Sequence, residues 1–244
     1  MTFTARAPGR QSLQGIAWLA RVGAAPLEPL ALVMGCSERV AHDHVRRLVA
    51  AGLVTRVAMR RGDGSLIALT GRGAVEAGYP GSRAVRSVAP TTWAHACACA
   101  WVSAWLEVRG RVWWSEREIT EDEFWRHDVR YQDRRGTVRV THCPDLGVRV
   151  AGRPAAVEVE LQRKVRARLL GIMSMYARLT ALSDGPLSGV LYVTGRDDVA
   201  TAVTRAARDA GLPAGTFSVR SLQVVIEQTR HAASASSADA GALR

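Results

Sequence analysis

Two glutamates within an apolar segment are the residues of this sequence best suited to chemistry. Glu158 and Glu160 alternate with Val157, Val159 and Leu161, and this alternation predicts a β-strand that projects both carboxylates from one face. Two anions buried among apolar side chains are costly unless a cation neutralises them. We therefore expect a cation to be bound beside this strand.

Asp145 supplies a third carboxylate for the same place. It lies in an alternating segment, residues 137–150, and a turn at residues 151–154 leads into the strand that carries the glutamates. We expect the two strands to pair, with Asp145 beside Glu158 and Glu160. Three carboxylates suit Mg²⁺ or Mn²⁺, and such an ion can activate water and stabilise the charge of a phosphodiester transition state. We therefore expect Mg²⁺ or Mn²⁺ as cofactor, with Asp145, Glu158 and Glu160 as metal ligands and catalytic residues.

Lys164 is the only lysine of the sequence. The chain has 33 Lys and Arg residues and no Asn, a bias that favours Arg, so a retained lysine can be needed as a compact point charge. Lys164 lies four residues after Glu160, and we expect it in the first turn of a helix at residues 162–182. It either forms an ion pair with Glu160 or takes part in catalysis, by positioning the attacking water or neutralising the transition state.

A purely structural alternative involves arginine. In that case Glu158 and Glu160 pair with arginines, which are abundant in this sequence, and no room is left for a metal ion. The arginines expected in this role are Arg139, Arg149 and Arg166.

The second half of the chain must position these residues. We expect residues 91–228 to form an αβββαβ sandwich with one further helix and one further strand at its C-terminal end. The predicted helices are residues 91–110, 162–182 and 197–211, and the predicted strands are residues 112–119, 137–150, 155–161, 189–195 and 217–222. Residues 120–136 fit none of these elements, and we expect an insertion or irregular loop there.

Positive charge is concentrated in the first half. The net charge of the chain is +11, and residues 1–90 carry 12 Arg against five acidic residues. A segment this basic is typical of a module that binds DNA or another polyanion. We expect three helices followed by two strands, which together predict a winged helix-turn-helix at residues 11–78. The predicted helices are residues 11–23, 26–34 and 37–52, and the strands are residues 53–60 and 65–70.

The third of these helices is the one expected to enter the major groove. Its predicted inward stripe consists of Val40, Val45, Leu48 and Val49. The DNA-binding residues are predicted at its start, on its opposite face and in the tip of the following hairpin, and they are Ser37, Arg39, His42, Asp43, Arg46, Arg47, Arg60 and Arg61. The alternatives are a charged face that is only solvated, or a surface for protein contacts.

Composition excludes several classes of protein. No apolar run reaches the roughly 18 to 20 residues of a membrane span, and the N-terminus lacks the apolar core of a signal peptide, so we expect a cytoplasmic protein with no membrane partner. The four cysteines are too few for a disulfide scaffold, and we expect reduced thiols. We also expect an N-terminal arm at residues 1–10, a linker at residues 79–90 and a disordered tail at residues 229–244.

Three resemblances extend this interpretation. Residues 11–78 resemble the MarR-like winged-helix group. Pro144-Asp145, the glutamate pair and the αβββαβ order resemble the PD-(D/E)XK nuclease superfamily, which implies a restriction-endonuclease-like fold. Over residues 11–225 the chain is similar to the replication-relaxation family of actinobacterial plasmids and mobile elements, through the winged helix, the helix around His95, the Trp114–Glu118 and Glu158–Lys164 segments, and Tyr176.

The last resemblance implies a role in plasmid replication or DNA relaxation. Its implied partners are double-stranded DNA, a second copy of the chain, and replication or transfer proteins. The nuclease pattern has lysine where this sequence has Glu160, so either Lys164 supplies the charge from the helix or the site is inactive. An inactive site would leave a non-catalytic winged-helix regulator or replication accessory factor, whose second domain serves dimerisation or recognition of DNA shape.

Overall fold

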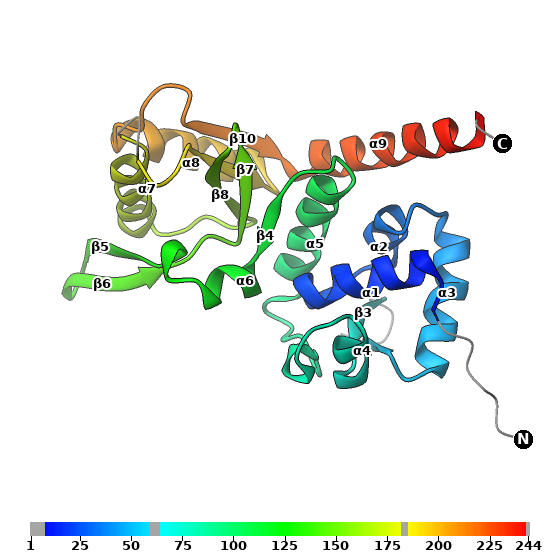
Figure 1. Ribbon diagram of the computed structural model, residues 1–244. Helices are drawn as coiled ribbons and strands as arrows, with labels where there is room; N and C mark the ends of the chain where they lie inside the picture. Colours follow the sequence, from blue (N-terminus) through cyan, green and yellow to red (C-terminus); the bar gives the residue numbers. More distant parts are fainter. Residues whose placement is uncertain (1–7, 59–63, 182–184, 243–244) are drawn as a thin grey trace, which may run out of the picture. The chain divides into compact units, whose positions relative to one another are not determined.

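The chain folds into two compact units. The computed structural model describes residues 8–58, 64–181 and 185–242. One unit comprises Met1–Arg109 and Glu227–Arg244, and the other comprises Gly110–Ile226. Both combine helices with β-sheet, so the fold is mixed α and β (Figure 1). Each unit is described by itself.

In the first unit, a small antiparallel sheet lies among helices. The elements in chain order are α1 (Arg10–Val22), β1 (Ala24–Ala25), α2 (Leu27–Val33), α3 (Glu38–Ala50), β2 (Val54–Ala58), β3 (Ser65–Leu69), α4 (Gly71–Glu76), the 3-10 helix η1 (Gly81–Arg83) and α5 (Trp93–Glu107). β3 lies between β1 and β2 and is antiparallel to both.

α3 buries a narrower stripe than its sequence predicts. Ala41, Val45 and Leu48 are buried, at the helical spacing of four and three residues. Val40 is 42% exposed and Val49 is 41% exposed, so their predicted place in the inward stripe is wrong. Val40 and Val49 lie at the two edges of this stripe, one on each side, so burial of Ala41, Val45 and Leu48 leaves both of them exposed.

The boundary between the units differs from the predicted linker at residues 79–90. Within that range η1 contacts α4, and the following helix α5 contacts α1, α2 and β1. The physical reason is burial of Trp93, which packs with Leu66 and Ala68 in an apolar cluster of the first unit. α5 therefore belongs with the first unit and not with the predicted αβββαβ sandwich.

The second unit is built on a five-stranded mixed sheet. Its elements are β4 (Trp113–Ser115), α6 (Glu116–Glu121), the 3-10 helix η2 (Glu123–Trp125), β5 (His127–Asp133), β6 (Gly136–His142), β7 (Leu146–Val150), β8 (Arg153–Glu160), α7 (Arg166–Thr180), β9 (Val190–Thr194), α8 (Asp197–Asp209) and β10 (Phe217–Ser221). The strand order is β10-β9-β8-β7-β4. β8, β9 and β10 run parallel, and β7 is antiparallel to β8 and to β4.

Three sequence predictions for residues 112–150 need correction. The predicted strand at residues 112–119 ends at Ser115, because Ser115 and Glu118 form a capping box that starts α6. The predicted irregular loop at residues 120–136 contains η2 and most of the β5–β6 hairpin. The predicted segment 137–150 is likewise two strands, β6 and β7, because it turns at Pro144.

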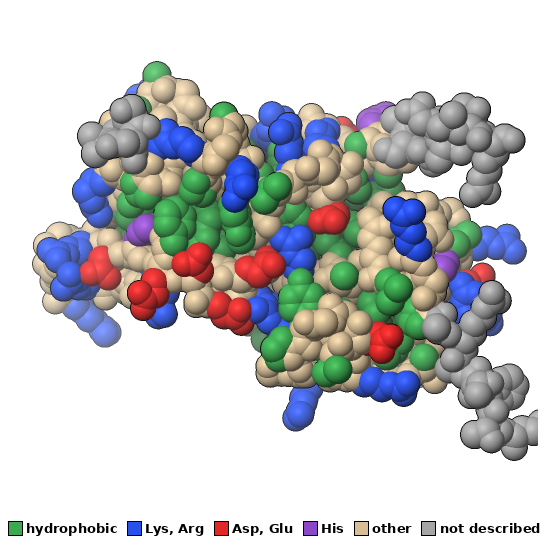
Figure 2. All heavy atoms as spheres, in the orientation of Figure 1, with side chains coloured by type: hydrophobic (Ala, Val, Ile, Leu, Met, Phe, Trp, Pro, Cys, Tyr) green, Lys and Arg blue, Asp and Glu red, His purple; other side chains and the backbone are tan. Residues whose placement is uncertain are grey.

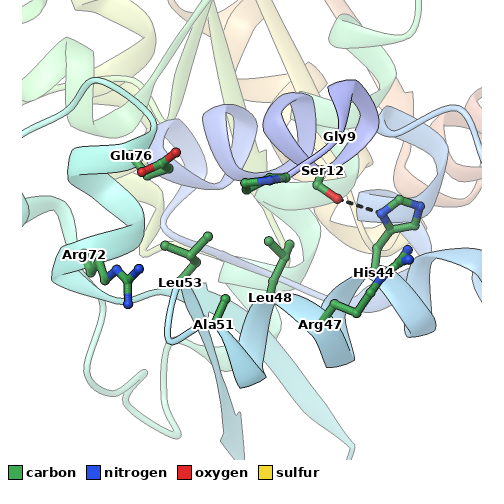
Figure 3. A pocket seen from close by; sticks show the side chains of 10 residues that line it. Gly9, Ser12, His44, Arg47, Leu48, Ala51, Leu53, Arg72 and Glu76 are labelled. Carbon is green, nitrogen blue, oxygen red and sulfur yellow. Dashed lines mark hydrogen bonds between the residues drawn. The ribbon is translucent and has the colours of Figure 1, made fainter. Parts of the chain in front are cut away.

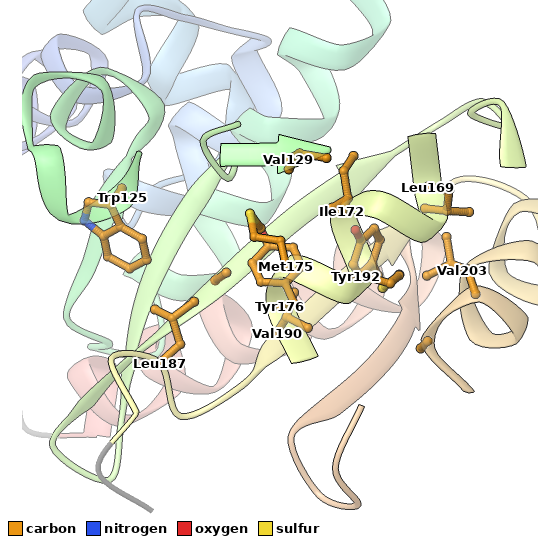
Figure 4. Packing of buried hydrophobic residues seen from close by; sticks show 14 of the residues in the cluster. Trp125, Val129, Leu169, Ile172, Met175, Tyr176, Leu187, Val190, Tyr192 and Val203 are labelled. Carbon is orange, nitrogen blue, oxygen red and sulfur yellow. The ribbon is translucent and has the colours of Figure 1, made fainter. Parts of the chain in front are cut away.

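One face of the large sheet packs against α7 and α8. Tyr176 of α7 and Tyr192 of β9 are fully or almost fully buried in this core, together with Leu169 and Val203 (Figure 4). Gly147 of β7 admits the indole of Trp125, since a Cβ at this position would lie 2.6 Å from the ring. The core therefore covers the strand that carries the two glutamates.

The C-terminal segment is helical rather than disordered as predicted. α9 runs from Leu222 to Ala242, and the division between the two units falls within it. Arg230 forms a bidentate ion pair with Glu28 of α2, with N–O distances of 2.6 and 3.0 Å, and its guanidinium lies over Trp101. The alanine-rich sequence favours the helix, and these contacts hold its first part.

The remaining global predictions concern cysteines and membranes. All four cysteines are free thiols, as predicted. Among the described helices, none is long and apolar enough to cross a membrane.

Candidate functional site

Strand pairing brings Asp145 to the two glutamates. Leu146 of β7 pairs with Val157 of β8, so Asp145 lies one step beyond this pair, level with Glu158. The Val159 N–H donates a hydrogen bond of 2.7 Å to Asp145 Oδ2. The Asp145 carboxylate is therefore fixed against the backbone of β8 between Glu158 and Glu160, but among the described residues the carboxylate oxygens of these three acids do not all lie within 4.8 Å of one another.

Glu158 is held by the side chains of Tyr176 and His142. It is 2% exposed, and its Oε1 accepts a short hydrogen bond from the Tyr176 hydroxyl. His142 Nε2 lies 2.6 Å from the same oxygen and 3.4 Å from the Tyr176 hydroxyl. Burial, and then the charge of Glu158, raise the pKa of Tyr176 well above its usual value, so Tyr176 remains a hydrogen-bond donor.

Glu160 is held by the only lysine. Lys164 Nζ forms an ion pair with Glu160 Oε2, and the two side chains are 24% and 10% exposed. Lys164 precedes the first turn of α7, which begins at Arg166, so its predicted place inside the helix is wrong by two residues. The loop lets the ammonium group reach back to the strand.

The three arginines proposed as alternative partners of the glutamates contact other groups. Arg139 pairs with Asp128 at 2.8 Å, and Arg166 pairs with Asp209 at 3.3 Å. The Arg149 guanidinium lies 5.5 Å from the centre of the Trp114 ring. Among the described residues, the partners of the glutamates are those named above, so the arginine prediction is wrong.

Sequence reasoning missed the role of His142 and the packing of Tyr192. His142 ends β6, and its place beside Glu158 depends on the β5–β6 hairpin that was expected to be partly a loop. Tyr192 pairs with Glu158 in the register of β8 and β9, and burial together with the charge of Glu158 raises its pKa well above the usual value. The sequence signal that could have placed His142 near the acids is its position three residues before Asp145.

The acidic run after β4 forms a separate, exposed surface. Glu116, Glu121, Asp122 and Glu123 are exposed on or beside α6. Figure 2 shows acidic side chains spread over this part of the second unit, with arginines gathered at the end of the β5–β6 hairpin. These four acids are therefore solvent-exposed side chains of the second unit.

α3 exposes the polar residues that were predicted to face DNA. The Ser37 hydroxyl accepts a hydrogen bond of 3.4 Å from the Val40 N–H and caps the helix. The exposed side chains of this face are Arg39, His42, Asp43 and Arg46. Asp43 and Arg46 form an ion pair of 3.4 Å. The predicted Arg60 and Arg61 lie outside the described residues.

Arg47 lies on a different side of α3, at a pocket of about 430 Å³ (Figure 3). His44 and Arg47 of α3 line it together with Ser12 of α1 and Arg72 of α4. The Ser12 hydroxyl is 2.7 Å from His44 Nδ1. Burial and the charge of Arg47 lower the pKa of His44. The predicted DNA-binding set therefore divides into a four-residue face and a residue that lines a pocket.

Comparison with known proteins shows one weak structural similarity and no sequence match. The sequence matches no protein-family model and no curated protein. Among solved structures, the protein VC1899 from Vibrio cholerae is similar with a TM-score of 0.33 and 12% sequence identity. The match covers 94% of this chain and 57% of the other, so this chain spans about half the length of that protein.

Proposed function

We propose that the protein binds double-stranded DNA through its first unit and hydrolyses phosphodiester bonds at the acidic end of β8. The observation that carries the proposal is the bond from the Val159 N–H to Asp145, which holds a third carboxylate on the strand that carries Glu158 and Glu160, beside the only lysine. The resemblance to the replication-relaxation family gives the biological setting, which is replication or relaxation of a plasmid or another mobile element.

The order of elements supports DNA binding by the first unit. α1, β1, α2, α3, β2 and β3 follow one another, with β3 central in an antiparallel sheet, as a winged helix requires. The third helix carries four exposed polar side chains within two turns, two of them arginines. Residues 1–90 also hold most of the excess positive charge.

The donor set of the second unit consists of the oxygen ligands that a hard divalent cation prefers, and binding the ion requires the three carboxylates to approach one another, because their oxygens do not all lie within 4.8 Å in this structure. Asp145, Glu158 and Glu160 offer carboxylate oxygens, and both bonds to Glu158 go to Oε1, so Oε2 takes neither. When bound, Mg²⁺ or Mn²⁺ supplies a nucleophilic water and stabilises negative charge on phosphate. The sheet order β10-β9-β8-β7-β4, with β7 antiparallel to its neighbours, supports the nuclease-like sandwich.

The protein side chains perform the remaining tasks. Tyr176 and His142 fix the orientation of the Glu158 carboxylate. Lys164 brings a positive charge to the same strand end, where it can stabilise a phosphate oxygen of the transition state. On this proposal Lys164 supplies, from the loop before α7, the charge that lysine supplies in the nuclease pattern.

A second candidate function is non-catalytic DNA binding. It is favoured by the ion pair between Lys164 and Glu160, because this pair and the bonds to Glu158 satisfy both buried glutamates without a metal ion. The second unit would then serve dimerisation or recognition of DNA shape.

A plasmid-nicking assay separates the two functions. Supercoiled plasmid is incubated with Mg²⁺ or Mn²⁺ and wild-type protein, Asp145→Ala, Lys164→Ala or the control Asp133→Asn, which changes an exposed acid of β5. We expect nicking by the wild type and the control, and rates lower by about 100-fold for the other two variants. Equal nicking by wild type and Asp145→Ala, or none by wild type, favours the non-catalytic function.

A further inference from the structure

A small basic cleft lies between α7 and α8 in the second unit. Its volume is about 110 Å³, and its apolar floor includes Leu169 and Ala206. Four cationic side chains line it, Arg163, Lys164, Arg166 and Arg205, with Asp209 as the acidic residue. The volume suits about four water molecules or one anion of phosphate size, and it is too small to enclose a larger ligand.

The charges of this cleft are not balanced within the protein. Arg166 pairs with Asp209 at 3.3 Å, and Lys164 pairs with Glu160. Within the described part of the chain, Arg163 and Arg205 have no ion-pair partner. Two uncompensated guanidinium groups thus remain beside two paired cations, and gathering like charges is unfavourable unless an anion joins them.

Phosphate is the anion that matches this arrangement. Arginine binds phosphate oxygens with a planar pair of N–H donors, and arginines from two elements can bind one phosphate from two sides. The apolar floor strengthens such contacts, because it lowers the local dielectric constant. Since α7 begins at Arg166, the backbone N–H groups of its first turn add to the positive potential there.

Lys164 connects the cleft to the acidic site. It lines the cleft and also binds Glu160, so an anion in the cleft lies next to the place where the proposed reaction occurs. We propose that this basic cleft binds a backbone phosphate of a nucleic-acid strand, next to the phosphate that reaches the carboxylates. That this nucleic-acid strand is also the substrate rests on the proposed function. Binding of its phosphate in the cleft does not require catalysis.

The test measures binding of a labelled eight-nucleotide oligothymidylate to the full chain by fluorescence anisotropy, in EDTA and over a series of salt concentrations. We expect Arg163→Gln and Arg205→Gln to raise the Kd and to lower the slope of log K against log salt by about 0.7 each, as the loss of one single-strand phosphate contact predicts. The control Arg178→Gln removes the same charge from α7, roughly 18 Å further along the helix, and should leave Kd and slope unchanged. The arginines at positions 163, 178 and 205 are exposed, so the variants should share the wild-type unfolding temperature.

Two outcomes overturn the proposal. One is equal binding of the oligonucleotide by wild type, Arg163→Gln and Arg205→Gln. The other is displacement of the oligonucleotide by inorganic phosphate at concentrations as low as those of the oligonucleotide itself, which would assign the cleft to a free phosphate compound. Because EDTA excludes cleavage, failure of the nicking assay leaves this result untouched, and the two proposals fail independently.

Discussion

The exposed face of α3 and the acidic end of β8 both collect charged side chains, but the protein holds them in different ways. On α3, Arg46 has only an exposed partner, Asp43, at 3.4 Å, with side-chain exposures of 74% and 54%. At β8, Glu158 is 2% exposed and bound by two other side chains. Exposed pairs contribute little to stability, whereas buried charges depend on their partners. Substitutions on α3 should therefore report on binding alone, and substitutions at β8 should also report on folding.

The largest expected effect is on the stability of the second unit. Glu158→Ala removes the acceptor of the buried Tyr176 hydroxyl and the partner of His142, and it should lower the free energy of unfolding by about 3 kcal/mol. Glu158→Gln keeps an acceptor oxygen and should cost only about 1 kcal/mol. Urea denaturation in EDTA measures both. Unchanged or increased stability of Glu158→Ala would show that the buried carboxylate is strained without a metal ion, and the contrast with α3 would fail.

A smaller effect should appear on α3, and in binding rather than folding. Arg46→Ala should weaken binding to duplex DNA by about 1.5 kcal/mol, or roughly tenfold, and change the free energy of unfolding by less than about 0.5 kcal/mol. Titration with duplex DNA measures the affinity, and urea denaturation of the same protein sample measures the free energy of unfolding. Arg178→Ala, which removes an exposed arginine of α7, is the control for general loss of charge. Wild-type affinity of Arg46→Ala would assign this face to solvent or to a protein partner.

The acids of β8 were predictable from sequence, but their partners were not. Alternation of valine and glutamate predicts both the strand and the shared face of Glu158 and Glu160. The bond of Tyr176 to Glu158 requires α7 to pack on this strand, and the contact of His142 requires the β5–β6 hairpin. These are contacts between elements, which no local pattern encodes.

The same limit explains the wrong boundary and the wrong stripe. α5 is apolar enough to belong to the core of either unit, and its contacts with α1, α2 and β1, together with the packing of Trp93 with Leu66, assign it to the first one. Val40 and Val49 are apolar, yet their exposure depends on which side of α3 the other helices cover. Hydrophobicity thus predicts that each of these helices has a buried face, whereas the packing of the neighbouring elements determines which face that is.

The smallest expected effect is a dependence of stability on pH through His44. Burial, and then the charge of Arg47, lower the pKa of His44 below its ordinary value of 6.5, so the folded state favours the neutral ring. The unfolded chain binds the proton first as the pH falls. The stability contributed by the neutral ring is therefore complete above pH 6.5 and is lost as the pH falls from 6.5 through the folded pKa. Urea denaturation at pH 7.5 and pH 5 should give a smaller difference for His44→Gln than for the wild type. An equal difference for both proteins would place the pH dependence elsewhere, with His127 next to be tested because burial also lowers its pKa.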